Sequence, residues 1–138
     1  MTVLFSASEK QTHKIAADLA KTVKAPCVIC LKGTLGAGKT AFARGFIQAL
    51  CGKETTVQSP TFSLVQIYNS PRGEIWHFDM YRLKNKDEIF EIGADEAFYN
   101  AICLVEWSEK IPSFLPKHYM CVEIEIENDG RKITLSEV

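Results

Sequence analysis

The chain has 138 residues, 46% of them hydrophobic, which suits one compact domain with a single core. Its formal net charge of −1 argues against a large direct contact with nucleic acid, which needs a basic surface. No apolar run approaches the ~20 residues that a membrane span requires, and residues 1–8 lack a signal-peptide pattern. We therefore predict a cytoplasmic protein with a single domain over residues 1–138 and no membrane attachment.

The first half of the chain alternates short strands with amphipathic helices. The pattern predicts a strand at residues 3–5, a helix from Ser8 toward Val23, a strand at residues 27–31 and a helix at residues 39–50. Ser8 followed by Gln11 fits a capping box, and Pro26 follows the first helix as a stop. The strand at 27–31 is apolar on both faces, as in a sheet covered on both sides. Gly52 is placed to end the second helix.

Five cysteines occur, and Cys27 and Cys30 form a CxxC pair. The odd number, with no export signal, argues against a disulfide framework. Because the pair falls on a predicted strand, where residues three apart point to opposite faces, these two thiols cannot share a metal ion. We interpret them as buried, unreactive core residues.

The second half of the chain is dominated by strand patterns and turn residues. It predicts strands at residues 61–68 and 74–79, a short helix at 87–92, and strands at 102–106, 119–127 and 132–135. Asn, Asp, Pro and Gly separate the first two strands and the last two, which indicates two β-hairpins. A βαβ unit combined with hairpins predicts an α/β fold of three layers with a mixed parallel and antiparallel sheet.

The glycine-rich turn at residues 33–40, GTLGAGKT, matches the P-loop pattern GxxxxGK[ST]. Glycines allow successive N–H groups to point into one anion-binding hollow, and the following helix adds its positive N-terminal end. In this pattern Lys39 reaches the β- and γ-phosphates and the Thr40 hydroxyl binds Mg²⁺. A turn that binds nothing is the alternative, which the flanking buried strand and amphipathic helix disfavour. We therefore predict a single-domain P-loop NTPase with these phosphate-site residues: Gly33, Leu35, Gly36, Ala37, Gly38, Lys39 and Thr40.

A P-loop enzyme also needs an acidic side chain at the end of a neighbouring strand to hold Mg²⁺. Asp79 and Glu106 both end predicted strands. We predict that both lie in the site, one on the metal or its waters and one orienting the attacking water, and the residues alone leave these roles open. His77 shares a strand face with Asp79. We favour a packed, hydrogen-bonded histidine, with a supporting role behind the acids as the alternative.

A polar loop precedes the first predicted hairpin, and it ends in Ser-Pro-Thr-Phe at residues 59–62. In many nucleotide switches a threonine in such a loop contacts Mg²⁺ or the γ-phosphate, and the loop orders accordingly. Thr61 is the candidate for that contact here. An ordinary entry into a strand explains the same spacing equally well.

Taken together, these motifs resemble the TsaE (YjeE) family, the ATPase component of bacterial tRNA threonylcarbamoyladenosine synthesis. The matching blocks are LGAGKT at residues 35–40 with Arg-Gly at 44–45, SPTF at 59–62, HFDMYR at 77–82 and Glu-Trp at 106–107. The HFDMYR block is far more specific than the P-loop. The order of the blocks and the chain length also agree, so the resemblance covers nearly the whole chain.

The resemblance implies an ATPase that uses ATP and Mg²⁺. It implies catalytic roles for Lys39, Asp79 and Glu106, with Thr40 and Glu106 as the Mg²⁺ ligands. It further implies nucleotide contacts by residues outside the P-loop, namely Thr61, Asp79, Trp107, Gly130 and Arg131, the last two in a turn near the base.

The resemblance also implies partners. TsaD, acting with TsaB, transfers the threonylcarbamoyl group to adenosine 37 of tRNA, and the TsaE-like protein would meet tRNA only through that complex. Two alternatives remain at this point. One is a small P-loop kinase, which the short chain and its few arginines disfavour. The other is a nucleotide-dependent binding module with negligible turnover.

Overall fold

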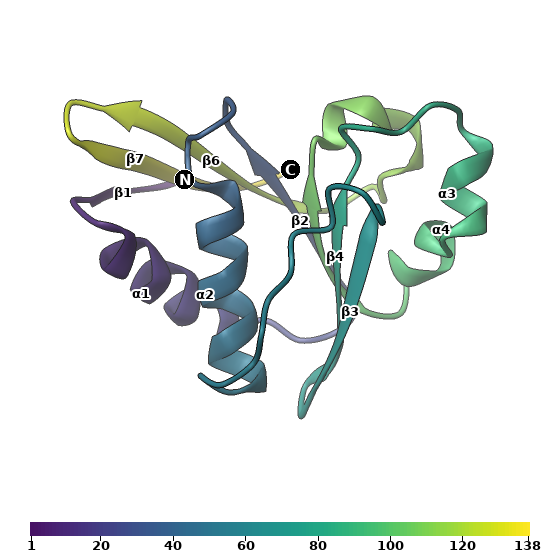
Figure 1. The fold of residues 1–138 in the computed structure, drawn as a ribbon, viewed down its shortest axis with the longest axis horizontal. Helices are drawn as coiled ribbons and strands as arrows, with labels where there is room; N and C mark the ends of the chain where they lie inside the picture. The colour runs from purple at the N-terminus through teal and green to yellow at the C-terminus, as the bar shows by residue number, and fades with distance from the viewer.

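The computed structural model describes residues 1–138, which form one seven-stranded sheet flanked by helices (Figure 1). The strands are β1 (Thr2–Ser6), β2 (Cys27–Lys32), β3 (Val65–Ser70), β4 (Gly73–Asp79), β5 (Ile102–Glu106), β6 (Met120–Glu127) and β7 (Gly130–Glu137). The helices are α1 (Glu9–Ala20), α2 (Lys39–Cys51), α3 (Asp87–Glu91) and α4 (Ala94–Ala97), with 3₁₀ turns η1 (Ser108–Lys110) and η2 (Pro112–Phe114). No helix is both long enough and apolar enough to cross a bilayer.

The sheet has the strand order β1-β7-β6-β2-β5-β4-β3. Strands β4, β5, β2 and β6 are parallel to one another, whereas β3 pairs antiparallel with β4 at one end and β7 and β1 add antiparallel pairs at the other. Helices α1 and α2 lie on one face, and α3 and α4 lie on the other (Figure 1). The predicted three-layer α/β fold with a mixed sheet is therefore confirmed.

Two buried clusters fill the space between the layers. One joins α1 and α2 to the sheet and includes Phe42, Phe46 and Leu104. The other lies under α3 and α4 and includes Phe78 and Phe98. All five residues of β5 are buried, so this strand is covered on both faces at the centre of the sheet.

The predicted helix boundaries of the first half hold with one correction. The Ser8 side chain accepts a hydrogen bond from the Gln11 amide, so the predicted cap is confirmed. Helix α1 ends at Ala20 and does not run on toward residue 23, because the Thr22 amide and hydroxyl both bond to the Leu19 carbonyl. Helix α2 closes as predicted at Gly52, which has φ +113°.

The CxxC pair points to opposite faces as predicted, and Cys30 is buried, but Cys27 is only half-buried. Cys30 is fully buried in the cluster under α3 and α4, whereas Cys27 packs against the opposite cluster. Both thiols are free, and burial raises the pKa of Cys30 to about 11. The two cysteine side chains therefore pack in the two different clusters, on opposite faces of the sheet.

The second half departs from the sequence prediction in three places. Residues 61–64 are a turn and not the start of a strand, because the Leu64 amide bonds back to the Pro60 carbonyl and Leu64 has φ +69°. Helix α4 was not predicted, since its four residues are too few to show a helical period. Both hairpin turns are shorter than predicted: β3 runs to Ser70 and β4 begins at Gly73, which leaves residues 71–72, and β7 begins at Gly130, which leaves residues 128–129.

Candidate functional site

The P-loop connects the carboxyl end of β2 to the first turn of α2. Gly36 and Gly38 have φ +80° and +113°, and a Cβ atom on either would meet nothing within 4 Å, so both line an open hollow. Gly33 is required for another reason: a Cβ there would lie 2.6 Å from the Ile124 carbonyl oxygen of β6. No side chain caps α2 at Gly38, which leaves its first N–H groups available for an anion.

Lys39 is the buried cation of this site, with 6% of its surface exposed. Its Nζ donates a 2.7 Å hydrogen bond to the Gly33 carbonyl and lies 3.7 Å from the centre of the Trp107 ring. Burial lowers the pKa of Lys39, and the Glu106 carboxylate opposes that shift. The ammonium group therefore contacts two neutral groups, the Gly33 carbonyl and the Trp107 ring, and a phosphate could take the place of either.

The two predicted acids are brought together by parallel pairing. Asp79 of β4 lies directly beside Glu106 of β5, and both are buried. Glu106 Oε1 lies 3.5 Å from the Thr40 hydroxyl, and Asp79 Oδ2 lies 3.4 Å from the Thr61 hydroxyl. The sequence-predicted P-loop, acids and loop threonine thus meet at one point.

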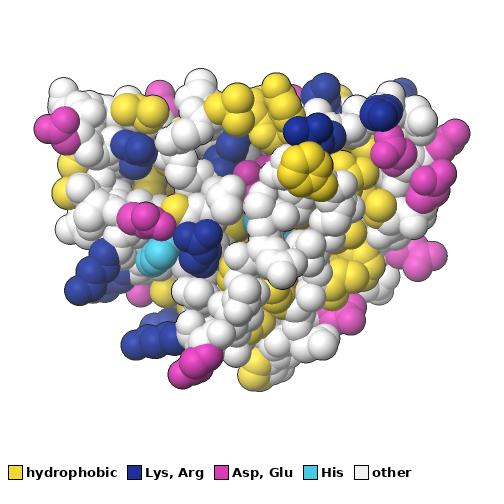
Figure 2. All heavy atoms as spheres, in the orientation of Figure 1, with side chains coloured by type: hydrophobic (Ala, Val, Ile, Leu, Met, Phe, Trp, Pro, Cys, Tyr) yellow, Lys and Arg dark blue, Asp and Glu magenta, His cyan; other side chains and the backbone are white.

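These groups surround a cavity of about 270 Å³, here called the phosphate cavity. Its lining residues are Leu35, Gly36, Gly38, Lys39, Thr40, Ala41, Thr61, Asp79, Glu106 and Trp107. All but Ala41 were named from the sequence. Figure 2 shows hydrophobic side chains gathered along the upper edge of the molecule, where the carboxyl ends of the central strands lie, and Leu35 and Phe62 are among the large exposed apolar residues.

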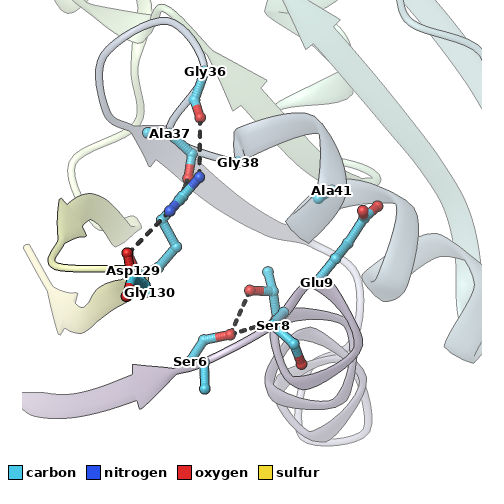
Figure 3. Close-up of a pocket in the computed structure, with 12 residues that line it drawn as sticks. Ser6, Ser8, Glu9, Gly36, Ala37, Gly38, Ala41, Asp129 and Gly130 are labelled. Atoms are coloured by element: carbon cyan, nitrogen blue, oxygen red, sulfur yellow. Dashed lines mark hydrogen bonds between the residues drawn. The ribbon is translucent and has the colours of Figure 1, made fainter.

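A second pocket of about 330 Å³ lies on the other side of the P-loop and is here called the Arg131 pocket (Figure 3). It is lined by residues of the β1–α1 connection, the P-loop and the β6–β7 turn: Ser6, Ala7, Ser8, Glu9, Thr12, Gly36, Ala37, Gly38, Ala41, Asp129, Gly130 and Arg131. Of the predicted nucleotide contacts, Ala37, Gly130 and Arg131 are found here and not in the phosphate cavity. The predicted site is therefore divided between two pockets that share Gly36, Gly38 and Ala41, and the predicted Gly33 lines neither of them.

The walls formed by β1 and α1 were not predicted as part of a site. Ser6 is fully buried, and its hydroxyl lies 2.7 Å from that of Thr12. Ser8 and Glu9 form the side of the pocket opposite the P-loop, with the Ser8 hydroxyl capping α1 and the Glu9 side chain directed toward α2 (Figure 3). The capping box marked where α1 begins, whereas the packing of α1 on α2, with the His13 backbone against Gly45, is a contact that the sequence pattern does not record.

Arg131 holds the backbone of the P-loop. Its Nε donates a 2.7 Å hydrogen bond to the Ala37 carbonyl, and Nη2 lies 3.5 Å from the Gly36 carbonyl. In a trans peptide the carbonyl and the next N–H point in opposite directions. The Gly38 N–H, which shares a peptide with the Ala37 carbonyl, is therefore directed away from Arg131.

His77 lies directly behind the acids. The side chain is fully buried, with Nε2 2.6 Å from Glu106 Oε2. The prediction of a packed, hydrogen-bonded histidine is confirmed, and its partner proves to be one of the two site acids. Its position two residues before Asp79 on one strand face was the available signal.

The family model described as "Threonylcarbamoyl adenosine biosynthesis protein TsaE" matches residues 6–133. The "tRNA threonylcarbamoyladenosine biosynthesis protein TsaE" of Rickettsia typhi is 42% identical over 126 residues, which are 91% of this chain and 88% of that relative. The Bacillus subtilis protein of the same name is 37% identical over 131 residues, which are 94% and 81% of the two chains. The crystal structure of Bacillus subtilis YdiB matches with a TM-score of 0.79 at 32% identity, over 97% of this chain and 83% of that one. The resemblance seen in the motifs is confirmed, and this chain belongs to the TsaE family of threonylcarbamoyl adenosine biosynthesis proteins.

Proposed function

We propose that this protein binds ATP with Mg²⁺ and hydrolyses it in support of threonylcarbamoyl transfer to adenosine 37 of tRNA by TsaB and TsaD. The observation that carries the proposal is the convergence of Lys39, Thr40, Asp79 and Glu106 on one cavity at the end of the P-loop. Phosphoryl transfer depends mainly on positioned positive charge and on a held metal and water, and these side chains supply groups of those kinds.

Phosphate binding follows from the backbone. The uncapped start of α2 and the open side of Gly36 and Gly38 offer N–H groups and space for an anion. The Lys39 ammonium lies close enough to exchange the Gly33 carbonyl for a phosphate oxygen. The exchange is favourable because a hydrogen bond between charged groups is roughly twice as strong as a neutral one.

The donor atoms beside the P-loop fit Mg²⁺. Thr40 Oγ1 and Glu106 Oε1 are both hard oxygen ligands, and Mg²⁺ is held in such sites by one or two carboxylates together with phosphates and water. Thr40 and Glu106 would hold the ion. When bound, Mg²⁺ would supply positive charge to the β- and γ-phosphate oxygens.

Asp79 is the residue we assign to the attacking water. Its Oδ1 accepts a 2.9 Å hydrogen bond from the Tyr81 amide, and Oδ2 faces the Thr61 hydroxyl. A carboxylate fixed in this way can orient water without moving during the reaction. We propose that turnover is slow in the isolated protein and rises when the partners complete the site.

The loop around Thr61 is proposed to carry the response to ATP. Its hydroxyl lies 2.6 Å from that of Ser59 and also faces Asp79, so it joins the exposed loop to the cavity wall. Phe62, the next residue, is 82% exposed and stacks under the Arg82 guanidinium. A γ-phosphate that changes the Thr61 contact would therefore change the surface offered to TsaB and TsaD.

The test is phosphate release from ATP by the purified protein, with and without Mg²⁺ and with and without TsaB and TsaD. Mg²⁺-dependent release that increases with both partners is expected. ATP binding without release under any condition would leave only a nucleotide-dependent binding module. No ATP binding at all would refute the proposal.

A further inference from the structure

His77 is a polar side chain in an apolar position. It lies on the face of β4 that carries Ile75 into the core beneath α1 and α2, and it pairs in register with Leu104 of β5. The imidazole is 0% exposed. Burying a polar ring here is unfavourable unless its nitrogen atoms find partners.

Only one of those nitrogen atoms has a partner. Nε2 lies 2.6 Å from Glu106 Oε2, whereas Nδ1 is buried without a hydrogen bond. A histidine kept for packing alone is expected to satisfy both nitrogens or to be replaced by an apolar residue. The unpartnered Nδ1 therefore indicates that the bond to Glu106 is the reason for a histidine at this position.

The direction of this bond follows from its acceptor. A carboxylate that is to hold Mg²⁺ must be ionised and then only accepts, so in that state Nε2 carries the hydrogen and His77 is the donor. The bond holds Oε2 toward the core, and the other oxygen, Oε1, is left facing the Thr40 hydroxyl at 3.5 Å. Without the histidine, the Glu106 carboxylate could rotate away from Thr40.

We propose that His77 is a positioning residue that aligns Glu106 with Thr40 to form the Mg²⁺ site. The inference rests on the proposed function, since it concerns the residues assigned to that ion. His77 does not touch the nucleotide or the metal in this arrangement. Its effect should therefore appear in metal affinity and not in the metal-free binding of nucleotide.

Three substitutions of His77 separate the hydrogen bond from the space that the ring fills. His77→Gln keeps an N–H donor near the position of Nε2, whereas the shorter His77→Asn cannot reach Glu106 with its amide. His77→Met fills the same volume without any donor and replaces the Asn variant if that one does not fold. The exposed His118, which lines neither pocket, provides the control His118→Asn.

The experiment measures Mn²⁺ binding to the complex of the protein with ADP by electron paramagnetic resonance, and ADP binding in EDTA by calorimetry. His77→Asn or His77→Met is expected to weaken Mn²⁺ binding by about 10–100-fold, the usual effect of losing a residue that orients a metal ligand. ADP affinity in EDTA should be unchanged, and His77→Gln should restore most of the Mn²⁺ affinity.

The outcomes distinguish this inference from the proposed function. If wild-type protein binds Mn²⁺ with ADP and Glu106→Gln abolishes it, but a folded His77→Asn or His77→Met variant binds Mn²⁺ normally, the inference is overturned and the proposed function stands. A folded His77→Gln variant as weak as His77→Asn also overturns it. If the wild-type complex with ADP binds no Mn²⁺, the proposed metal site and this inference both fail.

Discussion

The two pockets that flank the P-loop differ in how deeply their charged side chains are buried. The phosphate cavity is lined by Lys39, Asp79 and Glu106, which are charged, buried and attached to the ends of central parallel strands or the first turn of α2. The Arg131 pocket is lined by hydroxyl and backbone groups, and its two acidic side chains, Glu9 and Asp129, are exposed. Its one arginine donates its hydrogen bonds to carbonyls of the protein itself.

This difference suggests a division of tasks. Charged groups held rigidly beside developing charge act on the transition state. Groups that contact a ligand away from the reacting phosphate bind ground state and transition state alike, which changes affinity and leaves turnover unaltered. Substitutions in the phosphate cavity should therefore reduce hydrolysis, and substitutions in the Arg131 pocket should weaken nucleotide binding.

The largest effect is expected from Lys39→Ala. Loss of the only buried ammonium group in the cavity should reduce hydrolysis by more than about 10²-fold and should also weaken ATP binding, because a cation on the γ-phosphate is lost. Phosphate-release assays and calorimetry measure the two effects, with the exposed Lys53→Ala as the control. Unchanged ATP affinity together with normal hydrolysis would reject the phosphate cavity as the site.

The two acids should affect turnover more than binding. Glu106→Gln is expected to lower kcat by about 10²-fold or more, the usual scale for a positioned catalytic carboxyl group, with a smaller loss of ATP affinity. The same assays on Asp79→Asn test its assignment to water, and the exposed Glu91→Gln is the control. A neutral Glu106→Gln beside a severe Asp79→Asn would reverse the two roles.

The same contrast governs how much of the site could be predicted from the sequence. The phosphate cavity was predictable because glycine spacing in the P-loop and acids at the ends of apolar strands are local signals. Parallel pairing of β4 with β5 then places Asp79 beside Glu106. The β1–α1 wall of the Arg131 pocket was missed, because Ser6 meets Arg131 only through the pairing of β1 with β7, which no local pattern records.

Errors in the fold have a similar origin. Residues 61–64 have the composition of a strand, but the Asp79 amide bonds to the Leu64 carbonyl and fixes the chain where the turn ends. Leu64 then adopts a left-handed backbone that a branched or bulky residue enters only under tertiary constraint. Contacts distant in the sequence thus overrode the local preference.

A smaller effect is expected at the edge of the phosphate cavity. Thr61→Ala removes the hydroxyl that faces both Ser59 and Asp79. It should reduce the ATP-dependent increase in affinity for TsaB and TsaD, which for coupling of ~1–3 kcal/mol is about 5–150-fold. Titration of the purified partners with and without ATP measures it. Thr61→Ser should retain the gain, and the exposed Ser63→Ala is the control. Partners that bind equally well in both conditions would contradict the coupling.

The smallest effect, and the one that most directly tests the division of tasks, is expected in the Arg131 pocket. Arg131→Ala removes the donors to the Ala37 and Gly36 carbonyls, so the P-loop is no longer held with the Gly38 N–H directed away from the arginine. The net value of such a bond, ~1 kcal/mol, corresponds to about 5–10-fold weaker ATP binding.

Turnover at saturating ATP should change little in Arg131→Ala, because Lys39 and the two acids stay in place. Calorimetry and steady-state kinetics separate the ATP affinity from kcat, with the neighbouring Lys132→Ala as the control.

The variant Arg131→Lys distinguishes two ways in which the arginine could act. A lysine keeps the charge but lacks the planar fork of donors, so it should restore ATP binding only in part if the arginine acts by holding the loop. Full restoration by lysine would mean that Arg131 acts through its charge on the nucleotide. A loss of kcat as large as that of Glu106→Gln would show that the two pockets do not divide binding from catalysis.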